Sequence, residues 1–290
     1  MSFWTDALGA RIEYYDAGGW RTRALEAGDE GADVIMMGGL SGHVEGFIRN
    51  VVPLSQRGLR VHAIDVLGHG YTDKPLDVTY HAPAFTDHLL RFMDARGIAK
   101  AHIVGQSLGG WIALHTARTH PERVDKIVFA TGAGVLLSDE GRKEESEKVH
   151  AAVQSVTKKA VDSPSYESVK ARLEWLMADP ATVTDELIRT RLAIYQLADS
   201  RLAMAKLVEE QAGEGNRRYL LGEDDLAALP QETLVIWTDK NPTTPLEVGR
   251  RASELIPNAR FEVIENAGHW PMFEQPAEFN RLVGEFLAAS

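Results

Sequence analysis

One serine stands in a short pattern that is typical of nucleophilic serines. Ser107 is the centre of the motif GQSLG (105–109), which follows an apolar run and precedes a stretch with helical periodicity. A strand-to-helix turn of this kind is so tight that its flanking residues must be glycine, and it leaves the serine hydroxyl exposed. The N–H of Leu108 begins the helix, where its partial positive charge can stabilise an oxyanion. The motif therefore predicts that Ser107 attacks an electrophilic carbon.

An oxyanion needs a second donor, and an earlier glycine pair can supply it. The apolar run at 32–37 is followed directly by Gly38, Gly39 and Leu40. If that run is a strand parallel to the one before Ser107, a backbone N–H of Gly39 or Leu40 can face the same point. The alternative is that these glycines only turn the chain.

The general base should be a histidine, whose pKa lies near neutral pH. Of ten histidines, His269 has the best position, because it lies in the loop "ENAGHWPM" between the last predicted strand and the last predicted helix. In a doubly wound sheet this loop lies at the same carboxyl edge as Ser107. No histidine has metal-ligand spacing, and neither a metal nor another cofactor is expected.

The elements that must position these residues alternate along the chain. Apolar runs predict six strands, at 32–39, 60–66, 101–107, 126–132, 233–239 and 260–266. Helical periodicity is found at 45–56, 83–96, 108–119, 246–255 and 277–288. This alternation indicates a mostly parallel sheet that is covered on both faces. The more polar segments on either side of Gly18-Gly19-Trp20 predict an antiparallel hairpin at its edge.

One long segment interrupts the alternation. Residues 136–225 contain no convincing strand and only charged, amphipathic helical sequence, including an acidic and basic run at 139–148 that predicts a solvated helix face. The segment is too long for a simple crossover and predicts an inserted helical cap. The core would then consist of residues 1–135 and 226–290.

Composition excludes several classes of function. The chain has 290 residues, a net charge of −11 and no cysteine. The negative charge argues against a nucleic-acid partner, and no apolar run is long enough for a membrane span. Without cysteine there is no disulfide or thiolate. The polar start of the chain does not resemble a signal peptide, so a cytoplasmic location is expected. A small-molecule substrate is expected as the only ligand, and a homodimer is left open.

Taken together, these residues resemble the α/β-hydrolase fold. The resemblance runs over essentially the full length: the hairpin, "GGL" at 38–40, "DVLGHGYTDKP" at 65–75, "GQSLGG" at 105–110, the cap and "AGHWP" at 267–271. It implies an eight-stranded, mostly parallel sheet with an inserted helical cap. The serine in the elbow excludes haloalkane dehalogenases and epoxide hydrolases, which are similar but use aspartate there.

Two details resemble the meta-cleavage product hydrolases, which cut a carbon–carbon bond in 2-hydroxy-6-oxo-hexadienoates from aromatic ring degradation. One is Trp270, directly after the histidine, and the other is Arg191 in the cap segment "ELIRTRLAIYQ". The resemblance implies that Arg191 binds the substrate carboxylate and that Trp270 forms a wall of the same pocket. The family's usual "GNSMGG" is "GQSLGG" here, and its usual His-Gly at the oxyanion loop is Met37-Gly38.

The third member of a catalytic triad is ambiguous. By resemblance the acid lies four residues before a proline, and Pro245 then puts Asn241 at that position. Asparagine favours the wrong histidine tautomer in a serine protease. Asp239 is two residues earlier, and on extended backbone it would point to the same side as Asn241. We therefore expect Asp239 to be the acid, with Asn241 as an alternative orienter of His269 or an acid from elsewhere in the chain.

Three functions remain open at this point. The first is cleavage of a carbon–carbon bond in a 2-hydroxy-6-oxo-hexa-2,4-dienoate. The second is a carboxylesterase or another ester or amide hydrolase with the same triad. The third is a catalytically weak binding protein, which the missing aspartate favours. A cationic anchor at Arg191 separates the first from the second, since a dienoate carboxylate needs it and a simple ester does not. Arg191 could instead be a surface residue paired with Asp185 or Glu186.

Overall fold

Eight strands form one sheet in the order β1-β2-β4-β3-β5-β6-β7-β8 in a computed structural model that describes residues 2–137 and 155–288. β1 pairs antiparallel with β2 and β2 with β4, and all other neighbours are parallel. The strands are β1 (Arg11–Asp16), β2 (Arg21–Ala27), β3 (Ala32–Met37), β4 (Leu59–Ile64), β5 (Ala101–Gln106), β6 (Val124–Ala130), β7 (Thr233–Thr238) and β8 (Ala259–Ile264). The predicted eight-stranded, mostly parallel sheet with an edge hairpin is therefore confirmed.

Burial along the strands explains why the central ones are continuous apolar runs. Every residue of β5 and β7 is buried, whereas β1 is mostly exposed and β8 alternates as an edge strand does. A strand that is covered on both faces has no solvent side and needs no polar alternation.

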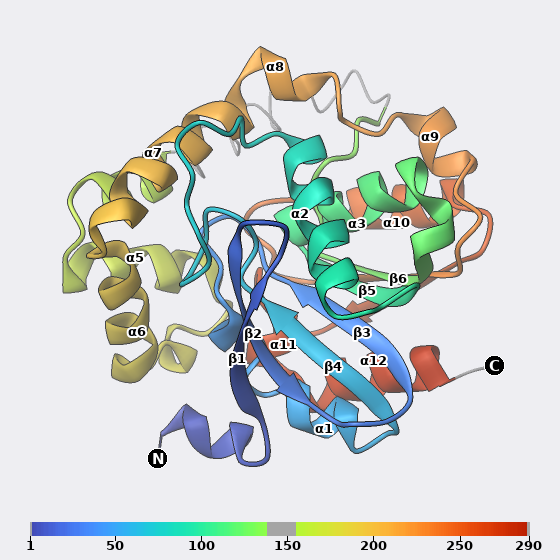
Figure 1. The fold of residues 1–290 in the computed structure, drawn as a ribbon, viewed down its shortest axis with the longest axis horizontal. Helices are drawn as coiled ribbons and strands as arrows, with labels where there is room; N and C mark the ends of the chain where they lie inside the picture. The colour runs from blue at the N-terminus through green and yellow to red at the C-terminus, as the bar shows by residue number, and fades with distance from the viewer. Residues whose placement is uncertain (1, 138–154, 289–290) are drawn as a thin grey trace.

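Helices cover the two faces of the sheet. Figure 1 shows α2 (Ala82–Ala95), α3 (Leu108–Thr119) and α10 (Leu246–Leu255) on one side, and α1 (Val51–Ser55), α11 (Pro271–Glu274) and α12 (Pro276–Ala288) on the other. None of the described helices is long and apolar enough to cross a membrane.

The helix predicted over 45–56 is wrong in its extent. This segment contains a 3-10 turn, η2 (Val44–Phe47), and then the short α1. A continuous helix would need Pro53 to donate a backbone hydrogen bond, which proline cannot do. The chain therefore starts a new helix at Val51, where Pro53 falls in the first turn.

The described part of the segment between β6 and β7 is mainly helical, as predicted. It contains α5 (Tyr166–Leu176), α6 (Asp185–Tyr195), α7 (Ala198–Ala212), α8 (Glu214–Arg217) and α9 (Glu223–Ala227). α5 packs on α6 and α6 on α7, and the three helices lie together to one side of α2 and α3 (Figure 1). α9 packs on α10 of the core. The run at 139–148 lies outside the described residues, and the division into core and cap stays a prediction.

The parallel strands bring the predicted site residues to one edge. β3, β5, β7 and β8 run in the same direction, so the loops after their carboxyl ends are neighbours. These four loops carry the glycines at 38–39, Ser107, the segment 239–245 and His269. The topology therefore brings together residues that lie as far apart in the chain as Gly38 and His269.

Candidate active site

The turn after β5 holds Ser107 in a strained conformation. Its φ of 54° and ψ of −116° lie in a region that residues other than glycine rarely adopt. A Cβ on Gly105 would collide with the backbone of Gly109, and one on Gly109 with the carbonyl of Met37. The flanking glycines are therefore required by backbone packing, as the motif predicts. The Ser107 side chain is half-buried at the start of α3.

The glycine loop after β3 lies directly against this serine. A Cβ added at Gly39 would be only 2.8 Å from Cβ of Ser107 and 3.1 Å from its Oγ. The N–H of Gly39, however, donates to Oε1 of Gln106 at 3.0 Å. The prediction of Gly39 as an oxyanion donor is wrong in this arrangement, because its only N–H is already used. The N–H groups of Leu40 and Leu108 remain, since neither has a hydrogen-bond partner in the described part of the chain.

His269 lies in the loop after β8 and is 6% exposed. Its backbone N–H donates to the carbonyl of Leu176, at the end of α5, at 2.7 Å. On the ring, Nδ1 is 3.0 Å from Oδ1 of Asn241 and 2.9 Å from Oγ1 of Thr243. Nδ1–H therefore donates to these two oxygens, which leaves the Nε2 lone pair free to act as a base.

Asp239 does not reach the histidine, so the expected assignment of the acid is wrong. Asp239 is exposed, and its carboxylate accepts from the N–H of Ala267 at 3.3 Å. The prediction assumed extended backbone from 239 to 241. Asp239 and Lys240 instead form a turn, in which Lys240 N–H bonds to the Ala267 carbonyl. The turn breaks the alternation that would have put both side chains on one side.

The fold also explains how an asparagine can present its oxygen to the ring. Asn241 Oδ1 accepts from the backbone N–H of Thr243 at 3.2 Å and from its hydroxyl at 2.9 Å. A backbone N–H can only donate, so the amide oxygen, not its NH₂ group, must face Thr243 and His269. This Asx turn could have been found in the sequence Asn-Pro-Thr. It favours the tautomer that a catalytic base needs.

Electrostatics keep the imidazole neutral. Burial and, to a smaller extent, the positive charge of Arg172 together lower the pKa of His269 to about 3. No carboxylate in the described ranges forms an ion pair with His269 to oppose these effects. His269 is therefore a deprotonated but weak base at neutral pH.

Gln106 connects the glycine loop after β3, Thr131 after β6 and the histidine loop. The sequence alone did not indicate this role. Besides accepting from Gly39, its amide Nε2 donates to the His269 carbonyl at 2.9 Å and to Oγ1 of Thr131 at 3.2 Å. Thr131 Oγ1 donates to the same carbonyl at 3.0 Å. The buried amide thus holds the oxyanion loop and the histidine loop at a fixed separation.

Glu274 makes a similar connection between the chain after α5 and the loop that carries His269. Its carboxylate accepts from the N–H groups of Gly268 at 2.8 Å, Trp270 at 3.2 Å and Ala178 at 2.6 Å. Burial raises the pKa of Glu274, and these backbone bonds oppose that change. The end of α5 is therefore tied to the loop that carries His269.

Arg191 of α6 is directed toward the core and is only 1% exposed. Its guanidinium carbon lies 4.8 Å from the centre of the Trp270 ring, and its Nε donates to Nε2 of His43 at 3.4 Å. Nη1 and Nη2 are buried without a hydrogen-bond partner. The alternative of a surface ion pair with Asp185 or Glu186 is wrong. Sequence reasoning thus found the residue, but not its His43 partner.

A chain of buried polar groups orients this arginine. The Glu45 carboxylate is 2.6 Å from Nη2 of Arg23 and 2.8 Å from Nδ1 of His43. Burial raises the pKa of Glu45, but His43 and Arg23 lower it more strongly, to about 2. With Nδ1–H donated to the carboxylate, Nε2 of His43 is left as the acceptor for Arg191. Arg191 is therefore held through Nε, with its two end nitrogens free.

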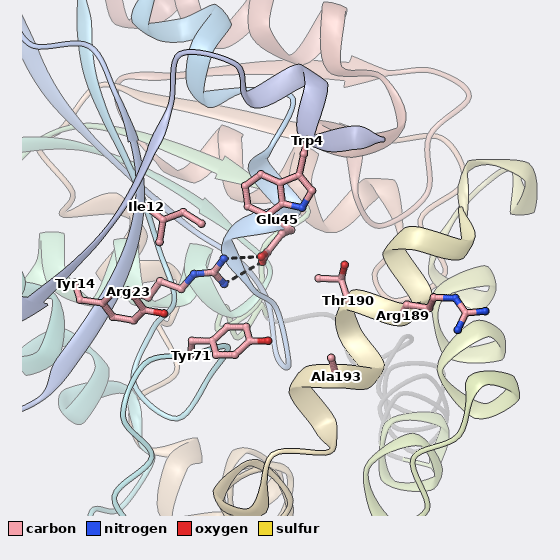
Figure 2. Close-up of a pocket in the computed structure, with 9 residues that line it drawn as sticks. All are labelled: Trp4, Ile12, Tyr14, Arg23, Glu45, Tyr71, Arg189, Thr190 and Ala193. Carbon is pink, nitrogen blue, oxygen red and sulfur yellow. Dashed lines mark hydrogen bonds and ion pairs between the residues drawn. The ribbon is translucent and has the colours of Figure 1, made fainter. Parts of the chain in front are cut away.

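Arg23 and Glu45 also line an open cleft of about 510 Å³ between the hairpin and α6. Figure 2 shows Tyr14 and Tyr71 beside this ion pair and Thr190 and Ala193 across from it. Neither Ser107 nor His269 lines the cleft. This cleft is therefore separate from the two predicted catalytic residues. Over the described ranges, no three acidic, histidine or cysteine residues are grouped as in a metal site.

Comparisons with known proteins identify the family to which the chain belongs. The family model of the α/β hydrolase fold matches residues 34–276. The chain is 32% identical to 2-hydroxymuconate semialdehyde hydrolase of Pseudomonas sp. (strain CF600), over 94% of this chain and 92% of that protein. It is 27% identical to 2-hydroxy-6-oxo-2,4-heptadienoate hydrolase of Pseudomonas putida (strain F1), over 94% and 95% of the two chains.

Solved structures of α/β hydrolases are similar to this chain over nearly its full length. The meta-cleavage product hydrolase CumD from Pseudomonas fluorescens IP01 superposes with a TM-score of 0.78 and 31% identity, and the match covers 97% of this chain and 98% of that one. A carboxylesterase from Bacillus subtilis has a TM-score of 0.79 but only 20% identity, with 99% and 96% of the chains covered. That second likeness shows a shared fold and no more.

Proposed function

The chain belongs to the α/β-hydrolase fold family, and from this premise we propose that it cleaves the carbon–carbon bond of a 2-hydroxy-6-oxo-hexa-2,4-dienoate, a meta-cleavage product of aromatic catabolism. Arg191 is the observation that carries the proposal. A buried guanidinium with two unpartnered end nitrogens is costly unless an anion binds there. The two end nitrogens of this guanidinium can donate to a carboxylate oxygen and to the adjacent C2 oxygen of a dienoate. An ester without a charge would leave it unpaired.

The first chemical step is a proton transfer within the substrate. The C2 hydroxyl loses its proton and C5 gains one, so the dienol becomes a ketone. His269 is the carrier, because its Nε2 is unprotonated at neutral pH and its ring is held by Asn241 and Thr243. Arg191 beside the C1 and C2 oxygens stabilises the negative charge that passes through that end.

The second step breaks the bond between C5 and C6. Ser107, or a water activated by the same Ser107–His269 pair, adds to the C6 carbonyl and gives up its proton to His269. The N–H groups of Leu40 and Leu108 stabilise the oxyanion. When the C6 carbonyl re-forms, the electron pair of the C5–C6 bond moves onto C5 and is delocalised to the C2 oxygen near Arg191. His269 returns its proton to the C2 oxygen of this dienolate, which leaves as a 2-hydroxypenta-2,4-dienoate. If Ser107 was the nucleophile, a water then hydrolyses the acyl-serine ester and releases the carboxylic acid from C6; if water was, the acid forms directly.

Asn241 favours one further candidate, a catalytically weak member of the fold that retains the pocket for binding. The imidazolium formed in the second step has no carboxylate to stabilise it in the described part of the site. Burst kinetics with an aryl ester distinguish the two, since an enzyme forms an acyl intermediate and a binding protein does not.

The decisive experiment is the decay of the yellow absorbance of a ring-cleavage dienoate on addition of the protein. Parallel assays use a small neutral aryl ester and the Ser107→Ala variant. Turnover of the dienoate that is lost in Ser107→Ala supports carbon–carbon cleavage. Turnover of the ester alone would make a general esterase the better conclusion, and no turnover of either would favour the binding protein.

We further propose a cytoplasmic location, a homodimeric state and a helical cap that comprises residues 136–225. Cell fractionation would test the cytoplasmic location, and analytical ultracentrifugation would test for a homodimer. Limited proteolysis would test the boundary of the cap at 136 and 225, since a separate cap should be released or degraded as a unit.

A further inference from the structure

The open cleft of about 510 Å³ beside α6 has no role in the mechanism above, although its volume is in the range of small-molecule pockets. One wall consists of β1 and the N-terminal turn η1 (Phe3–Ala7), and the opposite wall is α6. Arg23 and Glu45, which are both nearly fully buried, form the floor between the walls (Figure 2). The cleft therefore has the form of a separate ligand site.

The first wall presents apolar and aromatic side chains to solvent. Ile12, Tyr14 and Tyr71 are three of the seven large apolar side chains that are exposed in the described part of the chain. All three line this cleft, together with the indole of Trp4 (Figure 2). Exposed apolar side chains that gather in one cleft indicate a binding surface, and these suit a flat ring.

The opposite wall leaves room for such a ring. Thr190 and Ala193 of α6 face the aromatic side chains and are small, whereas Arg189 points away from them and pairs with Asp185 at 2.7 Å (Figure 2). A flat ligand can therefore lie between α6 and the aromatic wall.

Arginines hold two of the aromatic rings in place. The guanidinium carbon of Arg21 is 3.6 Å from the centre of the Tyr14 ring, and that of Arg23 is 4.9 Å from the centre of the Tyr71 ring. Rings that are already fixed lose little conformational entropy when a ligand packs against them.

The floor offers a hydrogen-bond acceptor and a donor side by side. Glu45 accepts through Oε1 from Nη2 of Arg23 at 2.6 Å, and through Oε2 from Nη1 of Arg23 at 3.3 Å and Nδ1 of His43 at 2.8 Å. A carboxylate has about four acceptor positions, so one is left at Oε1. The Nε–H of Arg23 makes no hydrogen bond within the described ranges.

Charge at this floor favours a neutral ligand. An anion would lie against Glu45 and a cation against Arg23, so that either would add a like charge to a buried ion pair. A hydroxyl group can donate to the carboxylate and accept from the guanidinium without adding charge. Together with the aromatic wall, this chemistry fits a hydroxyl group on an aromatic ring.

We propose that the cleft binds a neutral phenol, best a ring with two adjacent hydroxyl groups such as catechol, and that this ligand tightens the binding of the dienoate. One hydroxyl group bonds to Glu45 and the other to Arg23, while the ring packs against the aromatic wall.

The coupling to the dienoate has a short route. Glu45 bonds to His43, which accepts from Nε of Arg191 at 3.4 Å, and Thr190 in the wall is the neighbour of Arg191 on α6. A ligand between the walls therefore restrains the helix that carries the proposed carboxylate anchor. This coupling rests on the proposed function, whereas the binding of the phenol does not.

Isothermal titration calorimetry of the full chain with catechol under argon tests the binding. We expect a Kd of about 1 mM or tighter, as for other ligands of this size. Benzoate, benzylammonium and cyclohexane-1,2-diol should bind about 10-fold more weakly or not at all, because they are anionic, cationic and non-aromatic, respectively.

Three variants place the binding in the cleft. Ala193→Trp, at an exposed position of α6, should fill the cleft and abolish the binding. Tyr14→Leu removes a ring of the wall and should weaken binding by about 10-fold. Tyr219→Leu is the matched control, because Arg218 lies 4.8 Å from that ring in a second cleft of about 500 Å³. It should leave the Kd unchanged.

Steady-state assays test the coupling. Saturating catechol should lower the KM of the wild type for the dienoate by about 5-fold and leave kcat unchanged. It should have no effect on Ala193→Trp, nor on hydrolysis of the neutral aryl ester, which does not use Arg191.

Three results would overturn the inference. The first is a wild type that does not bind catechol or that prefers benzoate. The second is binding that Ala193→Trp and Tyr14→Leu leave unchanged, which would place it outside the cleft. The third is a rise in KM, which would show that catechol competes with the dienoate in the active site. If no dienoate is cleaved, the proposed function fails, and calorimetry still decides for or against the phenol site.

Discussion

Oδ1 of Asn241 lies 3.0 Å from Nδ1 of His269, at the position where the resemblance to serine hydrolases of this fold leads one to expect a carboxylate. The amide fixes the orientation of the ring but brings no charge. His269 is therefore oriented like a triad histidine and has the basicity of an isolated, buried imidazole.

Asn241→Asp should increase the rate of dienoate cleavage by about 10-fold or more, because a carboxylate stabilises the imidazolium in the transition state. It should also move the acid limb of the pH profile. The wild type needs only unprotonated His269 and should stay active well below about pH 6, whereas the variant should lose activity as the pH falls through a raised pKa. Measuring kcat against pH for both proteins checks the prediction.

Asn241→Ala and Asp239→Asn together test which of these two side chains orients His269. Asn241→Ala removes the orienting oxygen and should lower kcat by about 10². Asp239→Asn alters an exposed side chain and should change kcat less than about 3-fold. The reverse order of the two losses would restore Asp239 as the acid.

Ser107→Ala should lower kcat by about 10⁴ or more and leave the fold intact, since only a hydroxyl is removed. The melting temperature is expected to stay the same or rise. Alanine removes only the hydroxyl, and a catalytic position is selected for activity and not for stability. Steady-state assay and thermal melting check both points. Wild-type turnover in this variant would contradict the hydrolase assignment.

Arg191→Lys should impair dienoate cleavage by about 10² and barely change hydrolysis of a small neutral aryl ester. Lysine keeps the charge but cannot bond to His43 and offer a two-pronged contact at the same time. Equal losses on the two substrates would indicate a structural role for Arg191. Arg189→Lys, on the exposed side of the same helix, is the control.

Gln106→Ala should lower kcat by about 10-fold to 10² with little change in KM, because it releases both the oxyanion loop and the histidine loop. Gln106→Asn should not restore activity, since its side chain is one methylene shorter and cannot span the same two partners. A rise in KM at constant kcat would argue for a substrate contact instead.

The buried histidines predict sensitivity to acid. Burial lowers the pKa of His69, His88, His115 and His269 to between about 3 and 4. Unfolded histidine titrates near pH 6.5, so folding favours the neutral form. The stability that these residues contribute is complete above about pH 6.5 and is lost as the pH falls toward the folded values.

His88 allows the pH dependence of stability to be measured for one buried histidine outside the active site. Its Nε2 lies 2.8 Å from Oγ1 of Thr22, and its Nδ1 accepts from the N–H of Leu67 at 3.2 Å. His88→Asn should reduce the pH slope of the free energy of unfolding by one proton, about 1.4 kcal/mol per pH unit between roughly pH 4 and 6. Urea denaturation at several pH values gives this slope, and an unchanged slope would exclude the assignment.

The sequence by itself determined the parts of this protein that depend on local pattern. Apolar runs alternating with helical periodicity specify a parallel sheet, since a strand buried on both faces cannot carry polar residues. Ser107 and His269 could be identified because a tight turn demands glycines and because loops after parallel strands share one edge. Arg191 was identified only through the resemblance, because its sequence context is that of any amphipathic helix.

The tertiary structure alone decided which polar groups are paired. Whether Asp239 or Asn241 faces His269 depends on a turn at Asp239–Lys240 that bonds to a residue 27 positions away. Whether Gly39 or Leu40 has a free N–H depends on the Gln106 side chain. Hydrogen bonds require agreement within a few tenths of an ångström between distant segments, which no local pattern of residues specifies.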